Sequence, residues 1–228
     1  MKCEIKYAPN NLDEVIYPNI VVERTINGYA SGRLEGHVML YGPNGTGKTT
    51  LANLLIKAIG GEDAIFETKE CDELMSIKDL KHYLFRAGNI ASMTSSKKHF
   101  LLFDEFDNFS KGAHKLWMAL DYCGDTVMAV FTTNKPMDID RSIRSRADLI
   151  EFPAVSAAAA LPRIQHALQG EGVFLSNVQV LHYLKQVEEH KDIRKYMREA
   201  DKIILAVQDG LELPPWSGTK SSLKAVQV

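Results

Sequence analysis

The chain has 228 residues, of which 45% are hydrophobic and 25% are charged, and these values exclude a disordered or fibrous protein. Its formal net charge of -2 excludes a globally basic surface, although a local basic face remains compatible with it. Three widely spaced cysteines argue against a disulfide framework or a zinc site, and no apolar run reaches the roughly 20 residues that span a bilayer. We therefore expect a soluble cytoplasmic protein that has no signal peptide and no contact with a membrane.

The first two thirds of the chain alternate between two kinds of pattern. Short apolar runs bounded by polar or turn residues predict buried parallel strands at 37–41, 100–103 and 127–132. Apolar residues at helical spacing predict helices over 49–59 and 113–120. This alternation is typical of an α/β fold in which helices flank a parallel sheet, and we assign it to a domain over residues 1–153.

The character of the sequence changes after Pro153, because no strand pattern of comparable strength follows. Helical spacing of apolar residues predicts three helices, at 156–169, 178–187 and 193–207. Asp192 stands immediately before the last of them as an N-cap. We expect a small all-α lid domain over 154–210 and a loose C-terminal tail over 211–228.

A glycine-rich segment between the first predicted strand and its helix matches G-x-x-x-x-G-K-[ST] in full. Glycines let such a loop wrap tightly, so that backbone N–H groups converge on phosphate oxygens at the start of a helix. We expect Lys48 to reach the β- and γ-phosphates of ATP and the Thr49 hydroxyl to bind Mg²⁺. The predicted nucleotide-binding residues here are Gly42, Pro43, Asn44, Gly45, Thr46, Gly47, Lys48, Thr49 and Thr50.

Polar side chains follow the other two predicted strands. Asp104 comes directly after the second strand, so it should lie at the carboxyl edge of the sheet, where it can bind Mg²⁺ with Thr49. The adjacent Glu105 can orient and deprotonate a water, which favours hydrolysis over transfer to a small molecule. Asn134 follows the third strand, and its amide is expected to bond the attacking water or the γ-phosphate.

Two arginine motifs complete an ordered series of short motifs. The series is Lys6-Tyr7-Ala8-Pro9, Leu12-Asp13-Glu14-Val15, the glycine-rich loop, Asp104-Glu105-Phe106-Asp107, Thr132-Thr133-Asn134, Ser145-Arg146 and Asp192-Ile193-Arg194-Lys195. In this order it resembles the small ATPase subunits of sliding-clamp loaders, the replication factor C and phage-type branch of the AAA+ superfamily. The resemblance extends over about residues 5–205.

The resemblance implies roles for particular residues. Arg146 would act in trans as an arginine finger on the γ-phosphate of a neighbouring subunit, and Arg194 would contact the phosphates of its own subunit. Tyr7 and Pro9 would pack near the adenine, and Asn134 would be the sensor at the end of its strand. It also implies an oligomer with shared ATP sites that grips DNA at a primer–template or similar junction and a partner such as a sliding clamp. A phage origin would place it in the host cytoplasm.

Residues 76–88 form a basic stretch in which Lys78, Lys81, His82 and Arg86 recur at helical spacings. Because the equivalent helices of clamp loaders track DNA phosphates, Lys78, Lys81 and Arg86 are candidate DNA contacts, and Lys111 is a further one. A solvated helix face would account for the same pattern.

Two departures from the family pattern are visible. Ala147 replaces the cysteine that follows the finger arginine, and the chain ends at Val228, where loader subunits usually continue into a helical collar domain. We therefore expect oligomerisation to depend on the ATPase and lid domains, on a partner or on DNA. One alternative is an ATP-dependent DNA-bound filament or adaptor that recruits a helicase or recombinase. A second is a small-molecule P-loop kinase, which would usually lack Glu105 and so long a segment before the loop.

Overall fold

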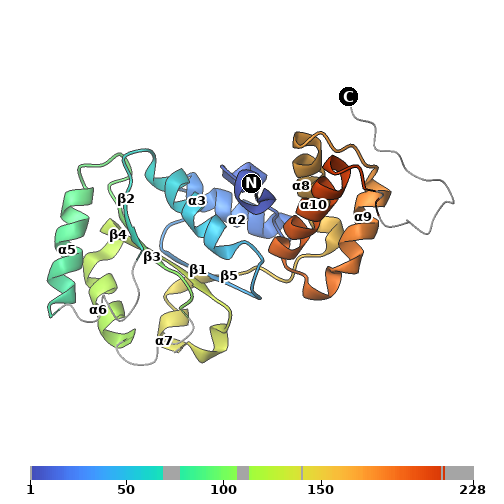
Figure 1. Ribbon diagram of the computed structural model, residues 1–228. Coiled ribbons are helices and arrows are strands. Elements are labelled where there is room, and N and C mark those ends of the chain that lie inside the picture. The colour runs from blue at the N-terminus through green and yellow to red at the C-terminus, as the bar shows by residue number, and fades with distance from the viewer. Residues whose placement is uncertain (1, 69–77, 107–112, 140, 212, 214–228) are drawn as a thin grey trace. The chain divides into compact units, whose positions relative to one another are not determined.

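The computed structural model describes the chain except residues 1, 69–77, 107–112, 140, 212 and 214–228. Most of the predicted C-terminal tail and Lys111 therefore lie outside the described residues. The chain divides into two compact units (Figure 1): a sheet unit, Asn10–Pro153, and a helical unit that combines Met1–Pro9 with Ala154–Val228. None of the described helices has the length and apolar character needed to cross a bilayer.

Within the described residues of the sheet unit, five parallel strands form one sheet in the order β2-β3-β4-β1-β5. The strands are β1 (His37–Tyr41), β2 (Ile65–Thr68), β3 (His99–Phe103), β4 (Val127–Thr133) and β5 (Ala147–Glu151). The principal helices are α2 (Ile20–Ala30), α3 (Lys48–Gly60), α5 (Leu80–Ala91), α6 (Ala113–Cys123) and the short α7 (Arg141–Arg144). Single turns of 3-10 helix occur at η1 (Leu12–Glu14), η2 (Gly124–Thr126) and η3 (Pro136–Asp138). The predicted parallel sheet flanked by helices is confirmed.

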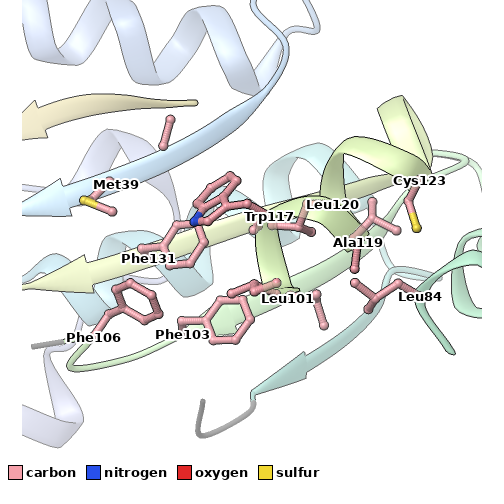
Figure 2. Close-up of a cluster of buried hydrophobic side chains, with 14 of the residues drawn as sticks. Met39, Leu84, Leu101, Phe103, Phe106, Trp117, Ala119, Leu120, Cys123 and Phe131 are labelled. Atoms are coloured by element: carbon pink, nitrogen blue, oxygen red, sulfur yellow. The ribbon is translucent and has the colours of Figure 1, made fainter. Parts of the chain in front are cut away.

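Each face of the sheet has its own hydrophobic core, because successive side chains of a strand point to opposite faces. Even-numbered strand residues such as Leu40 and Val130 pack with α2 and α3. Odd-numbered residues pack with α5 and α6, where Phe131 lies between Phe103 and Trp117 at ring centroid distances of 5.0 and 5.6 Å (Figure 2). Burial on both faces is why the central strands are continuous apolar runs in the sequence.

The helical unit contains α1 (Cys3–Lys6), α8 (Ala157–Gly170), α9 (Asn177–Gln186), the turn η4 (Glu188–His190) and α10 (Ile193–Gln208). Side chains cap the three longer helices: Ser156 accepts a backbone N–H of α8, Ser176 forms a capping box with Gln179 on α9, and Asp192 accepts the Arg194 N–H. The Tyr196 ring is fully buried, and its hydroxyl donates to the Val155 carbonyl oxygen at 3.0 Å. A helical region after the sheet therefore matches the expected fold class.

The first nine residues differ from the sequence prediction, which placed them in the same domain as the sheet. They belong to the helical unit, because α1 packs on α10 and the Cys3 N–H donates to Asp201 Oδ1 at 2.8 Å. The Tyr7 hydroxyl donates to Glu171 Oε1 at 2.8 Å, and Lys6 forms an ion pair with the same carboxylate. These contacts hold the Lys6-Tyr7 motif against the end of α8.

Candidate active site

The glycine-rich loop connects β1 to α3, and its path is set by backbone contacts. The Gly42 N–H donates to the Thr133 carbonyl oxygen at 3.2 Å, so the loop begins against the end of β4. Gly42, Gly45 and Gly47 have φ angles of 145°, 73° and 92°, in the region that favours glycine. A Cβ at Gly42 would also overlap the carbonyl oxygen of Phe152. Gly42 is therefore required both by its φ angle and by this close approach.

Lys48, the first residue of α3, is buried, and its ammonium lies among oxygen atoms of the loop and of the segment that follows β4. It donates to the carbonyl oxygens of Gly42 and Pro43 at 2.9 and 2.7 Å and to Asn134 Oδ1 at 2.9 Å. The Thr46 hydroxyl donates to the same Pro43 carbonyl at 3.1 Å. Two predicted site residues, Lys48 and Asn134, are thus brought together at the carboxyl edge of the sheet.

Asp104 follows β3 and meets the hydroxyl groups of two threonines from different elements. Its Oδ1 atom accepts from Thr49 Oγ1 at 2.8 Å and from Thr132 Oγ1 at 2.5 Å. The two predicted metal ligands, Thr49 and Asp104, are therefore adjacent. Among the described residues no group of three or more His, Cys, Asp or Glu side chains gathers to bind a metal. A hydroxyl and a carboxylate beside a phosphate-binding loop match the oxygen ligands that Mg²⁺ prefers when phosphates and waters complete its shell.

Glu105 has an exposed side chain on a strained backbone, with a φ angle of 54°. Its N–H donates to Thr132 Oγ1 at 3.0 Å, and the next N–H, of Phe106, donates to the Thr132 carbonyl oxygen at 2.8 Å. The buried Phe106 ring lies 4.9 Å from that of Phe131. Thr132 thus anchors the turn that follows β3. The sequence placed Thr132 in the motif that ends at Asn134 but did not predict this anchoring role, although a buried threonine in an otherwise apolar strand was a usable signal.

The two predicted arginines lie in different units, and each forms an ion pair with a nearby aspartate. Arg146, just before β5, has its Nε atom 3.1 Å from Asp121 Oδ2 in the sheet unit. Arg194, in the first turn of α10, places Nε and Nη2 at 3.2 and 3.1 Å from the two carboxylate oxygens of Asp192. Tyr7 and Pro9 belong to the helical unit with Arg194, so the sheet unit does not by itself bring these three to the glycine-rich loop. Their proximity to a nucleotide stays a prediction.

Three of the four predicted DNA contacts are described. Lys78, Lys81 and Arg86 are exposed just before α5 and along it, as contacts with DNA phosphates would require. The Lys81 ammonium also lies 5.7 Å from the centre of the Tyr122 ring, a cation–π contact with α6. Lys111 lies outside the described residues.

A phosphate-type loop between a strand and a helix, with an acid at the end of a nearby strand, defines the class of P-loop nucleotide-binding proteins. Residues 38–154 match the model of the ATPase family associated with various cellular activities (AAA). Because this match covers half of the chain, the chain belongs to the AAA family.

Within that family the chain is similar to replication factor C small subunits. It is 27% identical over 176 residues to replication factor C small subunit 2 of Pyrobaculum islandicum, covering 75% of this chain and 54% of that protein. It is also 27% identical over 172 residues to the replication factor C small subunit of Archaeoglobus fulgidus, covering 74% and 53%. The chain spans about half the length of these curated relatives. The predicted family branch is thereby confirmed.

Solved structures support the same fold. The FIGL-1 AAA domain in complex with ADP aligns with a TM-score of 0.61 at 15% identity, covering 86% of this chain and 73% of that one. A point variant of Thermotoga maritima RuvB aligns with a TM-score of 0.61 at 18% identity, covering 89% and 65%. At these identities the similarity shows the fold alone.

Proposed function

We propose that this chain is an Mg²⁺-dependent, ATP-hydrolysing subunit of a clamp-loader-like assembly that acts on DNA and a partner protein. The proposal rests above all on the 2.8 Å hydrogen bond between Thr49 Oγ1 and Asp104 Oδ1. It joins the end of the glycine-rich loop to the acid that follows β3, the pair of oxygen ligands that P-loop ATPases use for Mg²⁺. The membership in the AAA family and the similarity to replication factor C small subunits support the same assignment.

Different groups of the site would bind the phosphates of ATP and the cation. The backbone N–H groups of residues 42–49 and the Lys48 ammonium bind the phosphates, and Thr49 and Asp104 hold the cation. Bound Mg²⁺ would neutralise charge on the phosphate oxygens. In this role Lys48 exchanges some of its present carbonyl contacts for phosphate oxygens, while Asn134 stays beside it.

Hydrolysis then requires a water in line with the γ-phosphorus. Glu105 accepts a proton from that water while the water oxygen forms a bond to the γ-phosphorus. The bond from the γ-phosphorus to the bridging oxygen breaks, which leaves ADP and phosphate. The strained backbone of Glu105 and its anchor at Thr132 direct the carboxylate away from the protein interior. Asn134 orients the water or the γ-phosphate through its amide.

The arginines link the site to an assembly. Arg146 would stabilise charge on the γ-phosphate of a neighbouring subunit, and Arg194 would contact the phosphates of its own subunit, with Tyr7 and Pro9 near the adenine. Lys78, Lys81 and Arg86 would contact DNA phosphates, consistent with their exposure. The preferred DNA would be a primer–template or similar junction, and the partner a ring-shaped clamp.

The hydrolytic assignment is tested with two variants. Lys48→Ala should lose both nucleotide binding and phosphate release. Glu105→Gln should retain binding and lower kcat at least about 100-fold, the usual scale for loss of a general base. Glu62→Gln changes an exposed carboxylate in the turn after α3 and serves as the matched control. Unchanged turnover in both Lys48→Ala and Glu105→Gln would overturn the assignment.

The assembly is tested by mixing and by counting. Arg146→Ala mixed with Lys48→Ala should regain part of the turnover, because one variant supplies the intact loop and the other the intact finger. A failure of rescue at every ratio would exclude shared sites. Particle mass with a non-hydrolysable ATP analogue and primed DNA should give a closed complex with a defined number of subunits. Open-ended growth would instead support the filament or adaptor function.

A further inference from the structure

The side chain of Arg146 is held by a residue that belongs to none of the motifs in the sequence. Asp121 lies in the last turn of α6, 25 positions earlier in the chain, and its Oδ2 and Oδ1 atoms lie 3.1 and 3.2 Å from Arg146 Nε. The contact uses the guanidinium nitrogen nearest the side-chain stem. It therefore sets the direction in which the guanidinium plane leaves the backbone.

The backbone on both sides of this pair is well fixed. Ala147 starts β5 in register with His37 of β1, and the Ser145 N–H donates to the Arg141 carbonyl oxygen at 3.0 Å at the end of α7. On the other side, α6 is anchored by the buried Trp117 and Leu120. The remaining freedom lies in the long Arg146 side chain itself, which has several rotatable bonds.

The exposure of the pair indicates what the contact does. The two side chains are 42% and 51% exposed, and an ion pair this open to solvent adds little to the stability of a fold. The same contact can still select among rotamers of an arginine whose neighbours in the chain are fixed. Orientation, more than folding stability, is thus the main physical effect of Asp121.

Nearby charged groups leave the Asp121 carboxylate available to Arg146. Asp121, Asp125, His37 and Lys98 line one cavity at the amino edge of the sheet. Burial lowers the pKa of His37 to about 4 against the opposing effect of both aspartates, so its ring is neutral near pH 7. The Lys98 ammonium lies 3.1 Å from Glu35 Oε1, in a separate ion pair.

We propose that Asp121 is a positioning residue that orients Arg146 toward the γ-phosphate bound by a neighbouring subunit. The proposal rests on the role in trans proposed above for Arg146. Asp121 itself touches neither nucleotide nor water, and acts only through the guanidinium.

The test measures steady-state turnover of the full chain with primed DNA. Asp121→Ala should lower kcat about two- to fivefold, the scale of an exposed ion pair, and leave the KM for ATP within about twofold, because the loop that binds nucleotide in the same subunit is untouched. Asp121→Glu, which restores a carboxylate, should recover most of kcat. Asp125→Asn removes a charge from the same cavity without altering the pair, and should behave as the wild type.

A double-mutant cycle separates positioning from a structural effect. The loss caused by Asp121→Ala should vanish in an Arg146→Ala background, since no guanidinium remains to orient. A loss that persists there, or one that Asp121→Glu does not rescue, would overturn the positioning role. Should Asp121→Ala fail to fold, Asp121→Asn replaces it in the same cycle. If Arg146→Ala alone leaves turnover unchanged, the proposed finger role of Arg146 fails. If Arg146→Ala lowers turnover to a measurable residual rate while Asp121→Ala leaves turnover unchanged, only the positioning role of Asp121 fails.

Discussion

The ammonium of Lys48 lies 2.9 Å from Oδ1 of Asn134, so the start of α3 and the end of β4 meet in one hydrogen bond. The two residues are 86 positions apart in the chain, and the parallel pairing of β1 with β4 brings them to the same edge of the sheet. In the proposed function, Asn134 senses the γ-phosphate and Lys48 binds it. This hydrogen bond therefore holds the sensing side chain beside the binding one.

Replacement of Asn134 by alanine should therefore slow the chemical step more than it weakens binding. We expect kcat for phosphate release to fall about 100-fold, the usual cost of losing one oriented polar group beside a developing charge, with a small change in nucleotide affinity. Asn134→Asp keeps an oxygen next to Lys48 but removes the amide donor, so it should also be slow. An unaltered kcat in Asn134→Ala would show that the amide has no part in the reaction.

The anchoring role of Thr132 can be tested with a near-isosteric change. Thr132→Val removes the hydroxyl that donates to Asp104 and accepts from the Glu105 N–H. The Asp104 carboxylate and the Glu105 N–H each lose this hydrogen bond. The free energy of unfolding in urea should fall by about 1–3 kcal/mol. More Mg²⁺ should also be needed for half-maximal turnover, because the Asp104 carboxylate loses its orienting donor. Thr132→Ser keeps the hydroxyl and should restore both quantities; equal losses in the two variants would contradict this account.

Two glycines that both have positive φ angles allow the effect of the close contact at the loop to be measured separately from backbone strain. Gly42 and Gly36 have φ angles of 145° and 113°, but a Cβ meets the Phe152 carbonyl oxygen at the first and nothing within 4 Å at the second. Gly36→Ala should lower the unfolding free energy only by the backbone strain that it introduces, about 1–3 kcal/mol. Gly42→Ala should lower the unfolding free energy further and abolish nucleotide binding. Equal unfolding free energies for the two variants, measured by urea denaturation, would show that the Phe152 main chain shifts to make room for the added methyl group.

Acid should destabilise the sheet unit in a defined range of pH. Burial lowers the pKa of His37 from 6.5 to about 4, and burial also lowers the pKa of His99. Between about pH 6.5 and about pH 4 the unfolded chain binds more protons than the folded one, so the free energy of unfolding falls as the pH falls. The slope from His37 alone approaches about 1.4 kcal/mol per pH unit. His37→Asn should flatten the dependence of the urea midpoint on pH across this range, and a slope equal to that of the wild type would exclude His37 as a source.

The sequence predicted the centre of the sheet better than its edges. β1, β3 and β4 are buried on both faces and are therefore visible as apolar runs. The edge strands were missed: β2 alternates half-buried with exposed residues, and β5 buries only Ala147 and Ile150. The helix α2 was missed too, because its buried face consists of Ile26, Gly28 and Tyr29 alone. Its cap was a usable signal, since the Asn19 side chain accepts hydrogen bonds from two backbone N–H groups of the first turn.

The candidate site shows a similar division. Lys48, Thr49, Asp104 and Asn134 could be placed together from the sequence, because the carboxyl ends of adjacent parallel strands converge on one edge. Thr132 and Asp121 could not, since their contacts depend on strand register and on the direction of individual side chains. The position of the first nine residues was also beyond a sequence argument, because α1 is held by single contacts such as that between Cys3 and Asp201.

The close approach of Gly42 to the Phe152 carbonyl has a mechanical consequence. Phe152 directly follows the last strand, and the helical unit begins two residues later, at Ala154. A displacement of the Phe152 main chain toward the loop would therefore meet Gly42 at once, because no room for even a Cβ remains between the two main chains. Because main-chain atoms make this approach, replacement of the Phe152 side chain would not by itself remove it.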